Sequence, residues 1–229
     1  MTSIDLIEQR VIACTRCPEL VTYREAVARE KVRRHRDQEY WGKPVPGFGD
    51  HAARLVLIGL APGAHGSNRT GRMFTGDASG DWLYRALYHN GFANTPAAID
   101  RADGLELRDC FITAAVRCAP PQNKPSTQEK ARCLPYLVDE LAALARLRVV
   151  VTLGKIADDA FHSILKRQGA YAEARRPFGH GVERLASLGR AGNVTVISSY
   201  HPSRQNTNTG VLTEPMLDHI FKRARALLT

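Results

Sequence analysis

Four short runs of apolar residues predict the strands of a sheet. Each run is continuous rather than alternating and is bounded by turn residues, which is typical of strands buried on both faces of a parallel sheet. The runs are RLVLIGLA at 54–61, FITAAVRC at 111–118, RVVVTLG at 148–154 and NVTVISSY at 193–200.

Amphipathic segments alternate with these runs and predict helices. Ser3 and Ser126 are expected N-caps, Pro18 suits a first helical position, and Gly91 suits a helix end. The alternation of strands and helices indicates an α/β fold with a mainly parallel sheet and right-handed crossovers. The expected helices cover residues 3–13, 18–36, 78–91, 126–145, 154–168 and 211–228.

Ligand sites in such folds lie beyond the carboxyl ends of the strands. That rule selects the segments after residues 61, 118, 153 and 200. Two of them are unusually polar and glycine-rich, GLAPGAHGSNRTGRMFTGDASG at 59–80 and HPSRQNTNTG at 201–210. The sequence therefore places the candidate site between these two segments.

Length and composition indicate one globular domain spanning residues 1–229. The chain has 229 residues, 44% hydrophobic and 24% charged, which excludes disordered, collagen-like and coiled-coil classes for the whole chain. No run approaches the ~20 apolar residues that cross a bilayer, and the acidic, polar start is unlike a signal peptide. We expect a cytoplasmic protein without a membrane partner.

A basic excess favours polyanionic partners, nucleic acid first and an anionic membrane second. Lys and Arg number 32 against 23 Asp and Glu, a net charge of +9. An arginine excess that follows genomic composition is the alternative, so charge alone decides nothing. Lys31, Arg33, Arg34 and Arg36 form a basic cluster, for which a solvated helix end is favoured over a dedicated phosphate contact.

Five cysteines in a cytoplasmic chain favour a metal site or free thiols over disulfides. Cys14 and Cys17 form a Cys-x-x-Cys pair, and Cys118 and Cys133 lie at a strand end and in the next helix. Four thiolates suit tetrahedral zinc or a 4Fe-4S cluster, and spacing does not separate the two. Cys110 is left over as a small buried hydrophobe.

Three motifs in order carry a resemblance to a known family. GLAPGAHGSNRTGRMFTGDASG, VRCAPPQNKPS and SYHPSRQNTNTG resemble segments of the type-b, or family 5, uracil-DNA glycosylases of bacteria and archaea. The resemblance runs from Cys14 to the last helix. It implies a three-layer α/β/α fold with a central four-stranded parallel sheet. It also implies that Cys14, Cys17, Cys118 and Cys133 hold a structural 4Fe-4S cluster, completed by the helical segment of about residues 1–40.

A glycosylase must extract one nucleotide from the stack and hold its base in a pocket. Glycine-rich backbone permits close approach to ligand oxygens, and Phe74 offers a flat apolar face for a base. By resemblance this segment and the end of the second strand form the base pocket, comprising Gly59, Leu60, Ala61, Pro62, Gly63, His65, Phe74 and Ala114, with Gly66 as a further permissive glycine. His65 is ambiguous between lining the pocket and packing the loop.

Glycosidic cleavage builds positive charge on the sugar and negative charge on the departing base. By similarity His201 hydrogen-bonds the leaving base. Asp77 is the first candidate for stabilising the sugar and orienting water, with helix capping as its alternative role. Asn123 is the second, by its match to the family motif.

Three positions depart from the pattern of better-known relatives. Ala61 replaces an acid or amide that positions water, so the water must be handled elsewhere. Ala114 replaces an asparagine that reads the uracil edge, which should relax discrimination and admit hypoxanthine and other deaminated bases. Met73 stands where the motif usually has proline.

Several polar residues are candidates for contact with DNA. The loop after His201 is expected to enter the minor groove and fill the gap left by the base, and further cations could hold phosphates. These residues are Ser203, Arg204, Gln205, Asn206, Arg69, Arg72 and Lys124.

The sequence thus predicts a monofunctional glycosylase acting in base excision repair, because no lysine stands out as a Schiff-base nucleophile. We expect it to act as a monomer on double-stranded DNA of the nucleoid and to leave an abasic site. The alternative is an iron-sulfur protein that recognises damaged bases without turnover. A covalent adduct through His201 is less favoured, because the characteristic basic loop is not evident.

Overall fold

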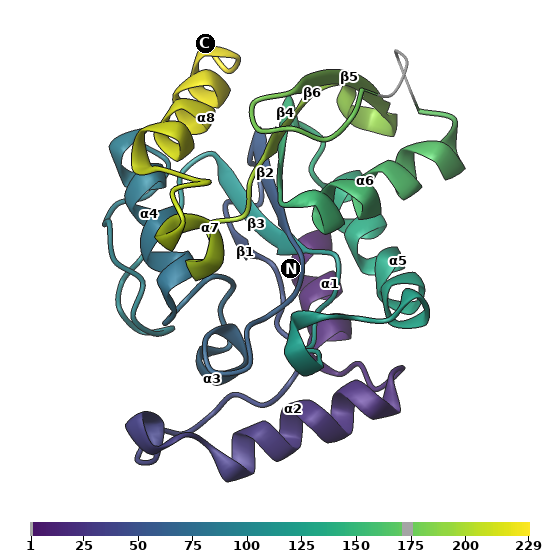
Figure 1. Ribbon diagram of the computed structural model, residues 1–229. Coiled ribbons are helices and arrows are strands. Elements are labelled where there is room, and N and C mark those ends of the chain that lie inside the picture. Colours follow the sequence, from purple (N-terminus) through teal and green to yellow (C-terminus); the bar gives the residue numbers. More distant parts are fainter. Residues whose placement is uncertain (1, 171–175) are drawn as a thin grey trace.

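The computed structural model describes residues 2–170 and 176–229, which surround one six-stranded sheet (Figure 1). Four strands are parallel and match the four predicted apolar runs. They are β2 (Leu55–Gly59), β3 (Cys110–Ala114), β4 (Val149–Leu153) and β6 (Gly192–Ser199). Two antiparallel edge strands, β1 (Phe48–Gly49) and β5 (Glu183–Leu188), were not predicted, and the order is β1-β3-β2-β4-β6-β5.

Helices cover both faces of this sheet, so the predicted three-layer α/β/α architecture is confirmed. The long helices are α1 (Ser3–Ile12), α2 (Pro18–Glu30), α4 (Ala78–His89), α5 (Thr127–Ala143), α6 (Lys155–Gln168) and α8 (Glu214–Ala226). Short helical turns are α3 (Ser67–Thr70), η1 (Arg33–His35), η2 (Pro121–Asn123), η3 (Gly189–Ala191) and α7 (Arg204–Asn208).

Two hydrophobic cores form because successive side chains of a strand point to opposite faces. On one face Leu55 and Leu57 pack with α4 and α8, and on the other Val56 and Ile58 pack with α1, α5 and α6. Helix α2 lies outside these layers and crosses below the sheet in Figure 1, near α3. No helix in the described parts of the chain is long and apolar enough to span a membrane.

The helix ends correct three predictions. Thr2, rather than Ser3, caps α1 through a reciprocal capping box, whereas Ser126 caps α5 as predicted. Helix α2 ends at Glu30 instead of residue 36, because Lys31 adopts a left-handed φ of 53°. The closing helix begins at Glu214 rather than 211.

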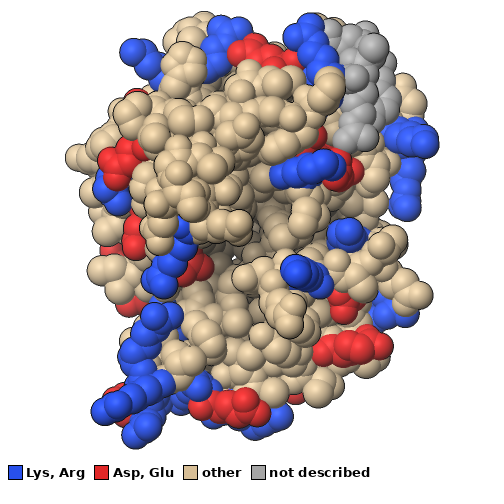
Figure 2. Space-filling view, in the orientation of Figure 1, with Lys and Arg blue, Asp and Glu red and all other residues tan. Residues whose placement is uncertain are grey.

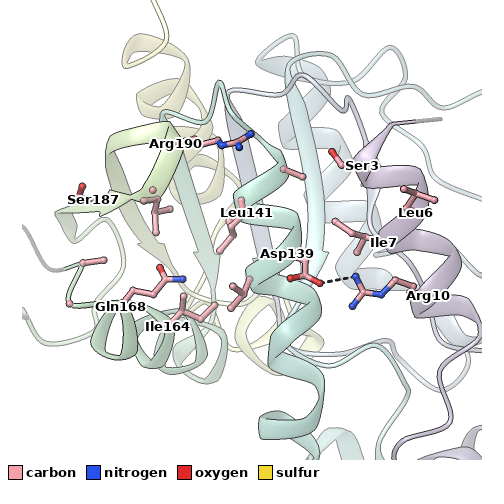
Figure 3. A pocket seen from close by; sticks show the side chains of 17 residues that line it. Ser3, Leu6, Ile7, Arg10, Asp139, Leu141, Ile164, Gln168, Ser187 and Arg190 are labelled. Carbon is pink, nitrogen blue, oxygen red and sulfur yellow. Dashed lines mark hydrogen bonds and ion pairs between the residues drawn. The ribbon is translucent and has the colours of Figure 1, made fainter.

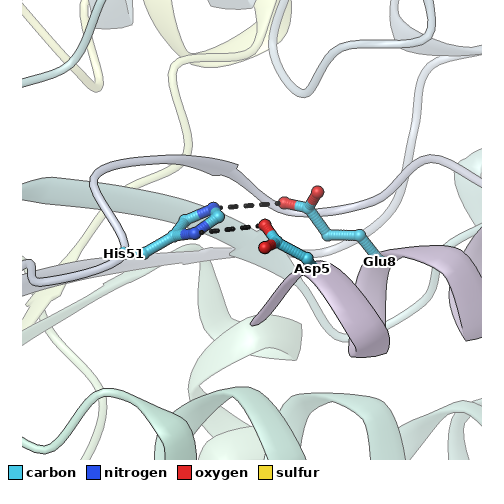
Figure 4. A group of neighbouring side chains, drawn as sticks. All are labelled: Asp5, Glu8 and His51. Carbon is cyan, nitrogen blue, oxygen red and sulfur yellow. Dashed lines mark ion pairs between the residues drawn. The ribbon is translucent and has the colours of Figure 1, made fainter. Parts of the chain in front are cut away.

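Polar side chains join the amino-terminal helix to the sheet (Figure 4). His51, in the turn between β1 and β2, lies between two carboxylates of α1, with Nδ1 3.5 Å from Asp5 Oδ1 and Nε2 3.7 Å from Glu8 Oε1. Among the described residues these three form the one group of His, Cys, Asp and Glu whose ligand atoms lie within 4.8 Å of one another. These polar contacts join α1 to the turn that leads into β2.

Candidate active site

The carboxyl ends of the four parallel strands meet at one edge of the sheet, as predicted. Backbone amides tie the segments that leave β2 and β3 together, because Ala115 N–H donates to Gly59 O and Val116 N–H to Leu60 O, both at 2.9 Å. Figure 2 shows a hollow near the centre of the molecular face drawn there, with Lys and Arg side chains on both sides. The loops that follow the strands therefore enclose one region.

Phe74 is held in a strained conformation at the base of this region. Its φ is 52°, which is unusual for a residue with a side chain, and only 9% of it is exposed. A Cβ on Gly59 would lie only 2.9 Å from Cε2 and Cζ of the Phe74 ring, which explains why glycine ends β2. The Tyr84 hydroxyl donates to Met73 O at 2.7 Å and supports this turn from α4.

His201 faces Phe74 from the segment after β6. The two ring centroids lie 5.9 Å apart with the planes tilted by 31°. Gly154, which follows β4, leaves room for the imidazole, since a Cβ there would lie 3.1 Å from His201 Cβ. Burial lowers the pKa of His201 to about 4, so the imidazole is neutral at physiological pH.

The two carboxylate oxygens of Asp77 face different parts of the site. Oδ1 accepts a hydrogen bond from Gly80 N–H at 3.0 Å and caps α4. Oδ2 faces the glycine-rich loop, where a Cβ on Gly63 would lie 3.1 Å away and a Cβ on Gly66 only 2.1 Å away. Burial raises the pKa of Asp77, while hydrogen bonds from backbone N–H groups oppose that shift. Capping therefore leaves one oxygen directed at the loop.

The other predicted pocket residues lie on or beside this loop. His65 packs edge-on against Tyr40, whose hydroxyl is 3.2 Å from His65 Nδ1, so it supports the loop. Ala61 packs instead against the hydrophobic group around Cys17 and Cys118. Pro62 and Ala114 are buried, Leu60 is half-buried, and Ala114 pairs in register with Gly59.

Arg69 and Arg72 do not extend into solvent as the predicted phosphate contacts would. Arg69 is 9% exposed and donates to His65 O, Gln38 Oε1 and Gly76 O at 2.7–2.9 Å. Arg72 is 5% exposed and forms a two-pronged ion pair with Asp103 at 2.6 and 2.8 Å. Their guanidinium groups brace the pocket loop from within.

The segment after His201 is a helical turn rather than an open loop. Ser203 caps α7, and Asn206 Nδ2–H donates to His201 O at 2.9 Å, which fixes the backbone of the histidine. Arg204 and Gln205 are exposed at the start of α7. These two side chains are therefore accessible, whereas Asn206 is used internally.

Asn123 and Lys124 lie on the exposed turn after β3. Gln122 and Asn123 both have left-handed backbones, with φ of 53° and 56°. Asn123 is exposed, and no hydrogen bond of its side chain is found within the described part of the chain. The structure thus brings together Phe74, Asp77 and His201 with the glycine-rich loop, and Asn123 lies on the exposed turn after β3.

The four predicted metal ligands converge on one small cavity. Cys14, Cys17, Cys118 and Cys133 line it together, beside Arg16 and Arg132. Burial raises the pKa of the thiols of Cys17 and Cys118, and that of Cys133 to about 12. Cys110 lies apart, fully buried in β3.

The surroundings of this cavity suit a large anionic group. Arg24 is 4% exposed and its Nη1–H lies 3.2 Å from Cys118 Sγ, while its Nε–H has no partner among the described residues. No three of the described sulfurs lie within 4.8 Å of one another. Four thiols around one cavity could hold a metal ion or a cluster, and this arrangement does not distinguish the two.

Comparison with known proteins fits this geometry. The family model described as Uracil DNA glycosylase superfamily matches residues 46–225. The chain belongs to the uracil DNA glycosylase superfamily. Within that superfamily, the sequence is 47% identical to the Type-5 uracil-DNA glycosylase of Thermus thermophilus over 96% of this chain and 95% of that protein. It is also 46% identical to the Type-5 uracil-DNA glycosylase of Pyrobaculum aerophilum, over 95% and 90%.

A more distant branch of the superfamily also matches. The Type-4 uracil-DNA glycosylase of Pyrobaculum aerophilum is 30% identical over 82% of this chain and 83% of that protein. The contrast between 47% and 30% supports the predicted resemblance to family 5.

A second hollow in this superfamily member lies away from the site. It measures about 930 Å³ and lies between α1 and α5 on one side and α6 and the β5–η3 turn on the other (Figure 3). Arg10 and Asp139 form an ion pair along its wall at 3.0 Å. None of the predicted site residues lines it, so its size does not make it the reaction site.

Sequence reasoning about this superfamily member missed residues that support the site from behind. Gly154 was detectable, because it follows a strand in one of the four selected segments. Asn68 was not: it is fully buried and joins α2 to the pocket loop, with Nδ2–H donating to Arg24 O at 3.2 Å and to Ala64 O at 3.4 Å. A buried asparagine in a polar loop gives no signal in the sequence pattern.

Proposed function

We propose that this protein excises uracil from DNA by hydrolysing the N-glycosidic bond. The observation that carries the proposal is the contact of the Phe74 and His201 rings, together with the position of Asp77 Oδ2 against the glycine-rich loop, at the carboxyl edge of the sheet. Relatives with the printed name uracil-DNA glycosylase, matched over nearly the full chain, support the same activity. A base removed without strand cleavage leaves an abasic site for base excision repair.

Phe74 and His201 act on the base. The Phe74 ring stacks on the extruded uracil, and the neutral His201 imidazole donates a hydrogen bond to O2 of uracil as that base departs as an anion. A neutral donor suits this role, because its bond strengthens as negative charge develops on the oxygen. The strained Phe74 backbone and the Asn206 contact hold both rings in place before the base arrives.

Asp77 acts on the sugar and on water. Its Oδ2 stabilises the positive charge that develops at the anomeric carbon and accepts a proton from the attacking water. Since Ala61 brings no acid or amide, this carboxylate replaces the water-positioning group of other relatives. Asn123, exposed on the η2 turn, is the second candidate for the same centre.

A matched pair of carboxylate variants tests the activity. Asp77→Asn keeps a capping oxygen, so α4 remains stable, but it removes the proton acceptor. We expect single-turnover excision from a uracil duplex, read as alkali-sensitive breaks, to fall by about 10²–10⁴-fold. The exposed Asp81→Asn in the same helix should retain the wild-type rate.

Wild-type protein that binds the uracil duplex without forming abasic sites would contradict the proposal. That result would identify a protein that recognises damaged bases without turnover. An adduct on denaturing gels would instead indicate covalent capture by His201.

We further propose a relaxed base preference on double-stranded DNA. Ala114, buried beside Gly59 at the end of β3, brings no amide to read the base edge, so hypoxanthine should also be excised. Duplexes carrying uracil, hypoxanthine, xanthine or an etheno adduct, compared side by side, test this. Activity confined to uracil would refute it.

We propose that Cys14, Cys17, Cys118 and Cys133 hold a structural 4Fe-4S cluster. When bound, the cluster would link α1–α2, the segment after β3 and α5. Protein purified anaerobically should contain about four iron atoms per chain and absorb in the visible blue. Cys118→Ala should abolish that absorption, whereas the control Cys110→Ala should keep it. Stoichiometric zinc without iron would overturn the assignment.

The proposed enzyme works as a monomer on DNA of the cytoplasmic nucleoid. Light scattering of the free protein and of its complex with duplex tests the monomer. A dimer in both samples would contradict it.

A further inference from the structure

The turn after α2 carries the basic cluster in an unexpected form. The sequence pattern continues α2 through Arg36, which would spread the arginines around a helix. Instead α2 ends at Glu30, and η1 gathers Arg33, Arg34 and Arg36 into one exposed turn. Lys31 Nζ donates to Arg36 O at 3.3 Å and closes this turn. We call residues 31–36 the arginine turn.

The arginine turn is fixed to the loop that forms the pocket. Just after it, Gln38 Oε1 accepts from Arg69 Nη1 at 2.7 Å, and Trp41 N–H donates to Arg69 O at 2.8 Å. Gly42 N–H donates to Asn68 O at 3.0 Å. The same Arg69 donates to His65 O within the pocket loop. A segment bonded at these points keeps a set position relative to the base pocket.

The charge of this turn is largely unneutralised. No ion pair within the described residues involves Arg33, Arg34 or Arg36, and Arg34 Nε–H donates only to His35 Nε2 at 3.2 Å. Asp37 and Glu39 are nearby, exposed and likewise without a described ion pair, so the segment from Lys31 to Glu39 keeps a formal net charge of +2. In contrast, Arg69 and Arg72 are fully engaged inside the loop.

The position and the chemistry select one kind of partner. Figure 2 shows the densest group of Lys and Arg at the lower-left corner, where Figure 1 places the turn after α2, on the face that contains the hollow. Guanidinium groups spaced along one turn suit a row of phosphates, because each can form two parallel hydrogen bonds to phosphate oxygens. A duplex bound over the pocket extends beyond the pocket on both sides.

We propose that the arginine turn binds the phosphate backbone of duplex DNA outside the nucleotides that surround the extruded base. The inference rests on the proposed function for the placement of the duplex. It adds a contact that positions the enzyme on long DNA and does not touch the reacting base.

The test replaces three arginines at once. Arg33→Gln, Arg34→Gln and Arg36→Gln remove three charges while keeping polar side chains of similar size. A matched triple variant, Arg108→Gln, Arg146→Gln and Arg190→Gln, removes the same charge from exposed residues that precede β3, β4 and β6, at the opposite edge of the sheet. Net charge is then equal in the two variants.

Binding to an undamaged duplex of about 30 base pairs is measured between ~50 and ~200 mM salt. Wild type and the matched variant should show the same salt slope, and the arginine-turn variant a slope smaller by about 2 to 3. On a duplex of about 10 base pairs centred on uracil, the two variants should bind alike. Single-turnover excision at saturating DNA should be unchanged in both.

Equal slopes for the two triple variants would overturn the proposal. The proposal would also fail if the arginine-turn variant lost binding to anionic phospholipid vesicles while its duplex binding stayed unchanged. That result would assign the turn to a membrane surface. Because the slope is measured on undamaged DNA, it does not depend on excision. Wild type without uracil excision would therefore defeat the proposed function while the slopes still decide this inference.

Discussion

The environment of His201 makes a quantitative prediction about stability and pH. Burial lowers the pKa of His201 from 6.5 to about 4 in the folded chain, whereas the unfolded chain keeps the ordinary value. A lowered histidine pKa means that the unfolded state binds the proton first as the pH falls. The contribution of His201 to stability is therefore fully present above about pH 6.5 and is lost progressively down to about pH 4.

The size of the effect follows from the two pKa values. Between about pH 7.5 and about pH 5, the different protonation of the two states lowers the free energy of unfolding by about 2 kcal/mol, or roughly 30-fold in the folding equilibrium. His201→Gln removes the titrating group and keeps a polar side chain. The free energy of unfolding of this variant should fall by about 2 kcal/mol less than that of wild type over the same interval.

Urea unfolding followed by tryptophan fluorescence measures this difference at each pH. The other histidines remain in both proteins and cancel in the comparison, and the exposed His219→Gln controls for the substitution itself. An NMR titration of the His201 ring gives the pKa directly. An ordinary midpoint near 6.5, or an equal pH dependence for wild type and His201→Gln, would refute the argument that this imidazole is buried and neutral.

Two further substitutions test the supports of the pocket. Gly66→Ala places a methyl group within 2.1 Å of Asp77 Oδ2, so the carboxylate must move. Single-turnover excision should fall at least tenfold with little change in duplex binding. An unchanged rate would mean that this oxygen is not used. Tyr84→Phe removes the hydrogen bond to Met73 O and should lower the free energy of unfolding by about 1 kcal/mol in urea titration. The affinity for uracil duplex should also weaken, because the strained Phe74 turn loosens. An unchanged free energy of unfolding and an unchanged affinity would show that packing alone holds the turn.

The central strands could be predicted from sequence because their signal is local. Continuous apolar runs marked the four parallel strands, and the rule that ligands bind beyond the carboxyl ends of such strands selected the segments that contain Phe74 and His201. The edge strand β5 carried no such signal: its burial alternates along Glu183–Leu188, but Arg184 is buried and Leu185 is exposed, so polar and apolar residues do not alternate with it. Strand β1, with only two residues at Phe48–Gly49, is too short for any pattern.

The errors arose where tertiary contacts outweigh local preference. Residues 31–36 have ordinary helical propensity, so nothing in their pattern shows that the chain leaves the helix at Lys31 to bond with the loop around Arg69. Arg69 and Arg72 lie in a polar loop that resembles an exposed one, yet their charges are used internally. A count of charges does not distinguish an arginine that binds carbonyl oxygens within the protein from an exposed arginine that is available to bind phosphate.

The division of labour within Asp77 bears on how this family member can evolve. One oxygen starts helix α4 and the other faces the glycine-rich loop, so a change of the carboxylate rotamer would break the helix cap. Its orientation is therefore set during folding, and no rearrangement is needed when substrate arrives. The same coupling restricts change, because a mutation that redirects this side chain to serve a new base must also supply another beginning for the helix.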